Sequence, residues 1–193
     1  MNYLAHLFLA DCNRLSLLGN LMGDFVKGRI DNTYPDVVTD GLILHRQIDK
    51  FTDSHKVFKE SRKRISKEQA RFSGVLVDVF YDHFLATNWQ RFSSVSFEHQ
   101  TNQWIDLLHG DMGFPLPEKL VFVLDAIKND KMLYLYQTTD GVEFVLKRLS
   151  NIIRFANNLS DGINELLENY QELDEDFNRF FPELMTYVES IKR

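Results

Sequence analysis

Cysteine, proline and glycine are scarce in this chain of 193 residues, which has 1 Cys, 4 Pro and 9 Gly. The single cysteine, Cys12, cannot form a disulfide within the chain, and no Cys/His spacing typical of a zinc site accompanies it. With 44% hydrophobic and 26% charged residues, the composition excludes disordered, collagenous and disulfide-stapled proteins. It predicts one globular domain over residues 1–193 in a reducing compartment.

Long apolar runs and several well-known motifs are also missing. No stretch approaches the roughly 20 apolar residues of a membrane span, and the N-terminal MNYLAHLFLA lacks the basic start and cleavage site of a secretory signal. The motifs GxGxxG, GxxxxGK[ST], GxSxG and HExxH do not occur. We therefore expect a cytoplasmic protein that has no nucleotide-binding loop and is not a serine hydrolase.

Positive charge is in deficit, because the net charge is -6. This argues against a nucleic-acid partner, since phosphate binding needs clustered Lys and Arg. Yet residues 42–72 hold nine basic and four acidic side chains, whereas residues 160–193 hold three basic and nine acidic ones. The basic segment is either a surface that steers an acidic partner or an ordinary solvated helix face.

Apolar residues recur at spacings of three and four along nearly the whole chain, and alternating strand patterns are absent. The sequence therefore predicts an all-α, single-domain helical bundle. A loop is expected over residues 110–117, and the predicted helices are Asn2–Asp11, Leu15–Lys27, Pro35–Asp53, Val57–Ile65, Gln69–Phe92, Phe97–Leu108, Glu118–Leu133, Gly141–Phe155 and Asp161–Lys192.

The last predicted helix carries a regular apolar seam from Ile163 to Ile191. Pro182 lacks a backbone N–H, so we expect the helix to bend or break near Phe181. The seam is expected to close the bundle of its own chain, and a dimer interface is the alternative. The protein is accordingly expected to be a monomer or a homodimer.

The segment VLVDVFYDHFL, residues 75–85, predicts a helix that is buried on most sides. Asp78 and Asp82 lie at i and i+4 on this helix, with His83 beside them. Two buried carboxylates need a cation or hydrogen bonds to compensate their charge. A divalent metal is the simplest compensator, and capping of nearby helix N-termini or pairing with Arg is the alternative.

Further polar residues interrupt other apolar helices. His45 and Asp49 lie one turn apart, so either both bind a metal or the carboxylate orients the imidazole. His6 stands alone in YLAHLFLA, and Asp24 closes the motif LLGNLMGD. Gly23, which precedes Asp24, and Gly19 four residues earlier allow another helix or a ligand to approach the backbone closely.

Four motifs occur together in this order: MNYLAHLFLA, SLLGNLMGDFVKG, LHRQID followed by FTD, and VDVFYDHFLATNW. In these motifs the chain resembles the bacterial acyl carrier protein phosphodiesterases. The resemblance implies an all-helical hydrolase, distantly related to the HD-domain phosphohydrolases, that uses Mn2+ or Mg2+. It implies cleavage of 4'-phosphopantetheine from a serine of holo-acyl carrier protein. The adjacent His-Asp pair of HD enzymes is missing, since Asp82 and His83 stand in reversed order.

Matched motif by motif, the resemblance implies seven candidate site residues: His6, Asp24, His45, Asp49, Asp78, Asp82 and His83. An ion that keeps waters needs fewer than seven protein ligands, so either two ions bind or some candidates support the ligands. We expect Asp24, His45, Asp49 and Asp78 to bind the metal. The catalytic set then holds Asp82 and His83, as orienting residues or ligands, and His6 as a general acid or base or as a hydrogen-bonding partner of the substrate.

Basic residues complete the expected site. Lys27, Arg46 or Lys50 would offset negative charge on the phosphoryl oxygens. The basic segment, with Arg62, Lys63 and Arg64 at its centre, would dock the acidic carrier protein. Two alternatives stay open: a helical metal phosphohydrolase that acts on nucleotides, and a noncatalytic helical binding protein that uses the apolar seam.

Overall fold

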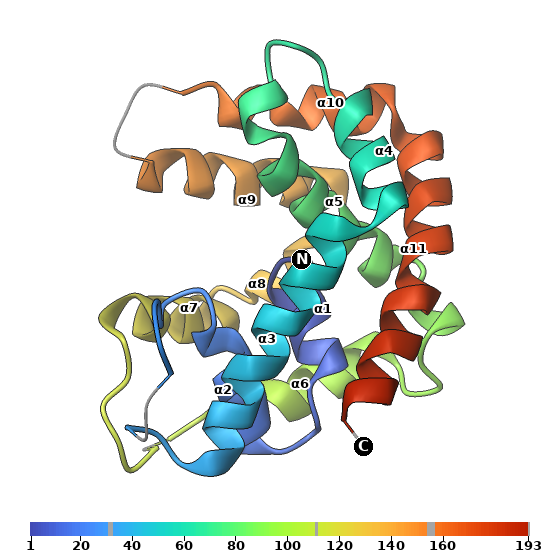
Figure 1. The fold of residues 1–193 in the computed structure, drawn as a ribbon. Coiled ribbons are helices and arrows are strands. Elements are labelled where there is room, and N and C mark those ends of the chain that lie inside the picture. The colour runs from blue at the N-terminus through green and yellow to red at the C-terminus, as the bar shows by residue number, and fades with distance from the viewer. Residues whose placement is uncertain (31–32, 111, 154–156, 193) are drawn as a thin grey trace.

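The computed structural model describes residues 1–30, 33–110, 112–153 and 157–192, and every regular element within these ranges is a helix. The predicted all-α class is confirmed. None of the described helices is long and apolar enough to cross a membrane. Figure 1 labels the α-helices, which are α1 (Tyr3–Leu9), α2 (Arg14–Met22), α3 (Asp36–Ser54), α4 (Lys56–Arg64), α5 (Ser73–Thr87), α6 (Phe97–Leu107), α7 (Glu118–Asn129), α8 (Met132–Leu135), α9 (Thr139–Ile152), α10 (Ile163–Glu168) and α11 (Tyr170–Ile191).

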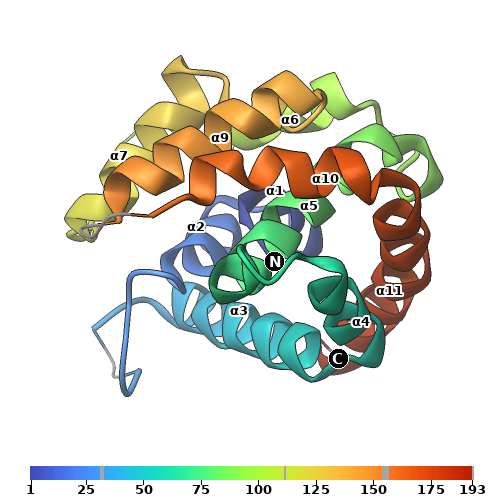
Figure 2. The same cartoon turned by 90° about the horizontal axis from the view of Figure 1, so that it is seen from above.

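Helix α5 is the central helix of the fold. Seen from above in Figure 2, α5 and α1 lie in the middle, surrounded by α9 and α10, by α11, and by α3 and α4. Eleven of its fifteen residues are buried, as its nearly continuous apolar sequence predicts. Because α5 contacts α1, α4, α9 and α11, its polar side chains Asp78, Asp82 and His83 are presented to other helices.

Helices α2 and α3 cross with their backbones in contact. A Cβ atom on Gly19 would lie 2.3 Å from the carbonyl oxygen of Val38, and one on Gly41 would lie 2.9 Å from the backbone nitrogen of Asn20. Only glycine permits such an approach, so the expectation of a close contact at Gly19 and Gly23 is confirmed. The contact brings the end of α2 against the middle of α3, where His45 lies.

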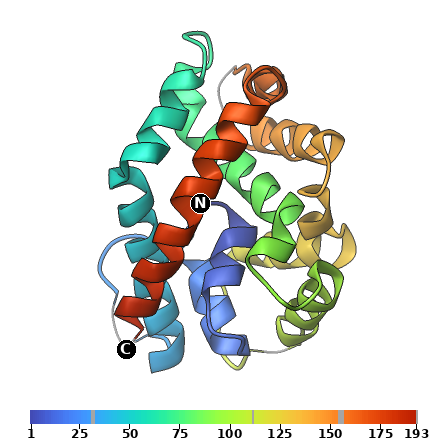
Figure 3. The same ribbon diagram turned by 90° about the vertical axis from the view of Figure 1, so that its right-hand side faces the viewer.

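The apolar seam packs inside the chain. Helix α11 runs diagonally beside α3 and α4 in Figure 3, and Phe177 and Phe180 contact the ring of Tyr81 on α5. Of the bend or break expected near Phe181, the break is wrong, because α11 continues through Pro182. Phe180, Phe181 and Leu184 on either side of the proline are fully buried. Their burial outweighs the roughly 3 kcal/mol that an interior proline costs.

Several predicted helix boundaries are also wrong. The second helix ends at Met22 rather than Lys27, because the chain turns at Gly23 and the backbone N–H of Phe25 bonds back to Met22. The helix predicted over residues 69–92 is three elements, with short 3-10 turns at Ala70–Phe72 and Trp89–Arg91 flanking α5. The helix predicted over residues 118–133 breaks at Lys131, whose φ of 50° is left-handed.

The C-terminal helical region is likewise divided. The helix predicted over residues 161–192 consists of a 3-10 turn at Leu159–Gly162, then α10, then α11 after a break at Asn169. Helix α9 ends at Ile152, and the expected end at Phe155 lies outside the described residues. The described part of the 110–117 loop contains no helix, and Gly110 and Gly113 have left-handed φ angles.

Candidate metal centre

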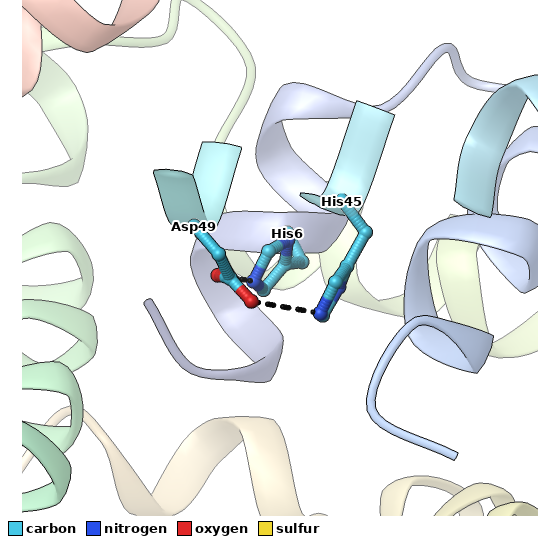
Figure 4. A group of neighbouring side chains, drawn as sticks. All are labelled: His6, His45 and Asp49. Atoms are coloured by element: carbon cyan, nitrogen blue, oxygen red, sulfur yellow. Dashed lines mark ion pairs between the residues drawn. The ribbon is translucent and has the colours of Figure 1, made fainter. Parts of the chain in front are cut away.

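Two imidazoles and one carboxylate meet between α1 and α3. His6 comes from α1, whereas His45 and Asp49 lie one turn apart on α3 (Figure 4). One potential ligand atom from each residue lies within 4.8 Å of the other two. His6 and His45 are 1% and 2% exposed, but the Asp49 side chain is 40% exposed. The imidazoles therefore form the floor of a site that opens to solvent at the carboxylate.

Helix α1 is fixed to the central helix just before His6. The Asp82 carboxylate on α5 accepts hydrogen bonds from the backbone N–H groups of Leu4, at 2.7 Å, and Ala5, at 3.1 Å. The first N–H groups of a helix have no partner within the helix, so this carboxylate caps α1. Because Ala5 directly precedes His6, Asp82 positions the imidazole without touching it.

The tautomer of His6 is set by Asn20 on α2. The ring nitrogen Nδ1 lies 2.9 Å from the amide oxygen Oδ1 of Asn20, and in the tautomer that donates a hydrogen bond to this oxygen Nδ1 carries the proton. The other nitrogen, Nε2, then has a lone pair and lies 3.2 Å from Oδ1 of Asp49. It is buried and has no hydrogen-bond partner among the described residues. Two electron-rich atoms thus face each other.

His45 lies flat against His6. The two ring centroids are 4.0 Å apart and the planes differ by 17°. His45 Nε2 lies 3.0 Å from the second oxygen of Asp49 and 3.8 Å from Oδ1 of Asp24. On its other side the ring rests on Gly23, where a Cβ atom would come within 2.1 Å of His45 Cγ. Helix α2 therefore holds the imidazole against Asp49.

The charges at the centre favour a cation. Burial and the neighbouring His45 lower the pKa of His6 to about 4, so its ring is neutral at pH 7. Burial alone would raise the pKa of Asp49, but the contact with His45 and the charge of the N-terminal ammonium oppose this shift, and the pKa lies well below its usual range. Near pH 7 the centre therefore presents a neutral imidazole lone pair beside an ionised carboxylate.

The donor set fits a divalent metal ion. Neutral imidazole and ionised carboxylate are the forms that bind metals, because the ligand must be deprotonated. Mn2+ accepts both nitrogen and oxygen donors, whereas Mg2+ prefers oxygen. A cation between His6 Nε2 and Asp49 would convert the repulsion of two lone pairs into attraction. The residues present thus fit the predicted Mn2+ better than the predicted Mg2+.

Asp24 and Asp78, both expected ligands, lie at the edge of the centre. The Asp24 side chain is 44% exposed and approaches the centre at His45, 3.8 Å away. The Asp78 carboxylate lies 2.8 Å from the backbone ammonium of Met1, which is 3.7 Å from Asp49. Burial raises the pKa of Asp78, and the ammonium opposes this shift. The compensating charge at Asp78 is therefore an ammonium group.

The two remaining α5 candidates do not reach the centre. Asp82 is fully buried and caps the N-terminus of α1. Helix capping was the alternative to metal binding that the sequence analysis gave for Asp78 and Asp82. His83 Nδ1 lies 2.7 Å from the carbonyl oxygen of Tyr136, and its Nε2 lies 2.9 Å from the hydroxyl of Tyr170. These contacts fix His83 to the C-terminal half of the chain.

Basic side chains surround one entrance to the centre. Lys27 and Arg46 line a hollow of about 360 Å³ together with His45 and Asp49. The Arg46 guanidinium also donates to the carbonyl oxygen of Val26, at 3.0 Å, which anchors it at the rim. Lys50 is exposed on α3 but is not among the residues that line this hollow. An anion in the hollow would meet two cationic groups and the open side of the centre.

The three basic residues in the last turn of α4 face different surroundings. Lys63 is exposed, and with Arg62 it lines a shallow hollow. The Arg64 guanidinium instead pairs with Asp176 on α11, at 2.9 Å, and this carboxylate is 1% exposed. Ser61 also donates a hydrogen bond to Asp176. Arg64 therefore joins α4 to α11, which leaves Arg62 and Lys63 as the more accessible pair.

Comparison with known proteins gives the family. The sequence model of the acyl carrier protein phosphodiesterases matches residues 1–184. The chain belongs to this family. Acyl carrier protein phosphodiesterases of Salmonella agona (strain SL483), Salmonella newport (strain SL254) and Salmonella heidelberg (strain SL476) are each 32% identical over 188 residues, which cover 96% of this chain and 96% of each relative.

Family membership confirms the resemblance and the enzyme class, a phosphoric diester hydrolase. No solved structure matches the chain. The kinship with HD-domain phosphohydrolases therefore stays a prediction, as do the metal and the individual site residues of this phosphodiesterase.

Two groups at the centre were not assigned a role from the sequence. The Met1 ammonium was not considered because motifs and spacing describe side chains, whereas this group belongs to the backbone. The role of Asn20 in setting the His6 tautomer was open to prediction, since Asn20 and Asp24 lie one turn apart in an otherwise apolar motif. A buried amide beside a histidine motif is a signal for such a second contact.

Proposed function

We propose that this acyl carrier protein phosphodiesterase uses a divalent cation, preferably Mn2+, to hydrolyse 4'-phosphopantetheine from the serine of holo-acyl carrier protein. Family membership supports the reaction class and the carrier protein. The cation is supported by one observation above all, the bare Nε2 of His6 that faces Asp49 at 3.2 Å.

In this proposal His6, His45 and Asp49 hold the cation, and Asp24 is the nearest further carboxylate. His6 thereby becomes a ligand instead of a general acid, because a ring with a pKa of about 4 is not in its imidazolium form at pH 7. A bound cation would supply positive charge for the phosphoryl oxygens and an acidified water. Asp82 keeps His6 in place through α1.

The phosphoryl group would bind in the hollow that His45 and Asp49 share with Lys27 and Arg46. The two basic side chains offset negative charge on its nonbridging oxygens, and Arg46 is already fixed by its bond to Val26. In the reaction, water adds to phosphorus and the bond from phosphorus to the serine oxygen breaks. The serine oxygen takes up a proton, which gives the apo carrier protein and free 4'-phosphopantetheine.

The carrier protein would approach along the basic face of α3 and α4. Acyl carrier proteins are acidic, and exposed Lys50, Arg62 and Lys63 provide charge of the opposite sign. Arg64 is better placed to hold α4 than to dock the carrier, because its guanidinium pairs with Asp176.

Incubation of the purified protein with holo-acyl carrier protein, Mn2+ and oxygen-18 water tests this proposal. Intact-mass measurement should show conversion to the apo form, with the label in the released 4'-phosphopantetheine. Asp49→Asn should abolish conversion, and a chelator should do the same until Mn2+ is restored. Asp53→Asn, which changes an exposed carboxylate one turn further along α3, serves as the matched control and should retain activity.

Two other outcomes would favour the alternative functions. Hydrolysis of nucleotides with no action on the holo carrier protein would indicate a nucleotide phosphohydrolase. Failure to bind Mn2+ and to hydrolyse any phosphodiester would indicate a noncatalytic binding protein. Either result would refute the proposed reaction.

A further inference from the structure

A second hollow borders the centre on the side of α7 and α9. This cleft has a volume of about 510 Å³, within the range of roughly 300–1,000 Å³ that is typical of small-molecule sites. Its apolar walls include Phe25 after α2, Phe122 and Val123 on α7, and Val145 and Leu149 on α9. The cleft is therefore built for a slender and partly apolar group.

The cleft adjoins the candidate metal centre at Asp24. Asp24 lines the cleft and also lies 3.8 Å from His45. The hollow with Lys27 and Arg46 borders the same centre through His45 and Asp49. The centre thus has two neighbouring spaces: one is lined by Lys27 and Arg46, and the other is mainly apolar, with Lys119 and Arg148 also in its lining.

One polar atom in the cleft has no partner. The Tyr136 side chain is fully buried and lines the cleft, yet its hydroxyl oxygen makes no hydrogen bond within the described residues. A buried hydroxyl without a partner costs about 1–3 kcal/mol. Burial raises the pKa of Tyr136 well above its usual value, so the hydroxyl keeps its proton and is a donor.

The two neighbouring spaces match the two substituents of the proposed phosphodiester. One substituent is a serine of a folded acidic protein, which needs an open approach beside cationic groups such as Lys27 and Arg46. The other is the pantetheine arm, a thin chain with two methyl groups on one carbon and two amides. Apolar walls with a few placed polar groups are the usual environment for such a ligand.

We propose that the cleft between α7 and α9 binds the pantetheine arm of the prosthetic group, with the Tyr136 hydroxyl donating a hydrogen bond to an amide carbonyl of the arm. This assignment rests on the proposed function, because it takes the arm from the substrate named there. It makes Tyr136 a substrate-binding residue.

Tyr136→Phe removes only the hydroxyl. We expect the KM for holo-acyl carrier protein to rise about 3-fold to 10-fold, the equivalent of one neutral hydrogen bond. Thermal stability of the free protein should be unchanged or slightly higher, since the hydroxyl has no partner in the chain. A marked loss of stability would show that the hydroxyl has a structural role and would overturn its assignment.

Val123→Trp reduces the cleft from a half-buried position on α7. Val37→Trp, at a 42% exposed position on α3 outside the cleft lining, is the matched control. NMR titration with pantetheine, which is the arm without phosphate, should show at least tenfold weaker binding to the Val123 variant only. Titration with inorganic phosphate should not distinguish the two variants. Equal pantetheine binding by both would overturn the cleft assignment.

The results separate this inference from the proposed function. If the unaltered protein hydrolyses the holo carrier and changes at Tyr136 and Val123 have no effect, the cleft assignment fails and the function stands. If it leaves the holo carrier intact but binds pantetheine in a manner that depends on Tyr136 and Val123, the proposed function fails and the cleft assignment stands.

Discussion

A methyl group at position 23 tests whether the packing of α2 against α3 holds His45 in place. Gly23 has an ordinary helical φ of -55°, so alanine fits its backbone. Its Cβ atom, however, would come within 2.1 Å of His45 Cγ and 2.2 Å of Cδ2. Atoms in ordinary contact are about 3.5–4.0 Å apart. The imidazole must therefore move, although Gly23→Ala changes no candidate ligand.

The expected effect is large for a single methyl group. Relief of the contact requires His45 to move by roughly 1 Å or more, and a displacement of about 1 Å at a catalytic site costs on the order of 100-fold in rate. The stack with His6 at 4.0 Å and the 3.0 Å contact with Asp49 would both be disturbed. Affinity for Mn2+ should therefore fall along with the rate.

Isothermal titration with Mn2+ and hydrolysis of holo-acyl carrier protein measure the two effects. Gly74→Ala is the control, because a Cβ atom there would lie 3.8 Å from Arg62, an ordinary distance. Melting temperatures in the presence of a chelator show whether each variant folds. If the Gly23 variant folds and keeps full Mn2+ affinity and activity, then metal binding and catalysis do not depend on the position of His45 against Gly23.

Three further predictions follow from the contacts around the centre. Asp82→Asn should weaken folding by about 2 kcal/mol, since the two backbone bonds end on different carboxylate oxygens and an amide replaces one of these oxygens with an NH2 donor. Burial raises the pKa of Asp82 to about 7 despite these bonds. Between about pH 4 and pH 7 the Asp82 side chain is therefore protonated in the folded wild type but ionised in the unfolded chain. The wild type loses stability as the pH rises through this range. Urea titrations with a chelator present should therefore show a larger difference in free energy of unfolding between wild type and the Asp82 variant at pH 5 than at pH 8. A difference that grows with pH would contradict this. Arg64→Glu should cost about 2 kcal/mol or more, because it places a carboxylate against the buried Asp176, whereas Lys63→Glu should change stability by less than about 0.5 kcal/mol. The Lys63 variant should instead raise the KM for the carrier protein, and steady-state kinetics that show equal KM values for the Lys63 variant and wild type would remove Lys63 from the docking surface.

The helical class and the main helices were predictable because the apolar spacing is a local property of the chain. The continuous apolar character of residues 75–85 correctly predicted a helix at the centre of the bundle. The glycines at 19 and 23 correctly predicted close packing. Local spacing did not predict the helix breaks at Lys131 and Asn169 or the uninterrupted helix through Pro182. Tertiary packing can outweigh local helix propensity, and the spacing of apolar residues does not reveal it.

The candidate site was predictable in composition but not in arrangement. The pair His45 and Asp49 was found because one turn of helix separates them. His6 was assigned to proton transfer, since sequence spacing does not show that α1 brings its ring to 4.0 Å from His45. Asp78 was expected to bind the metal and Asp82 to orient or bind it, because they share a helix face, yet one contacts an ammonium and the other caps α1. Such partners come from distant segments.

The most direct test of the centre is anomalous diffraction at the manganese absorption edge from crystals of the protein grown with Mn2+. A single strong peak within about 2.0–2.3 Å of nitrogen atoms from His6 and His45 and of an Asp49 oxygen would be the expected result. A fully occupied Mn2+ site elsewhere in the protein, with His6 Nε2 still facing Asp49 and no ion between them, would contradict the account.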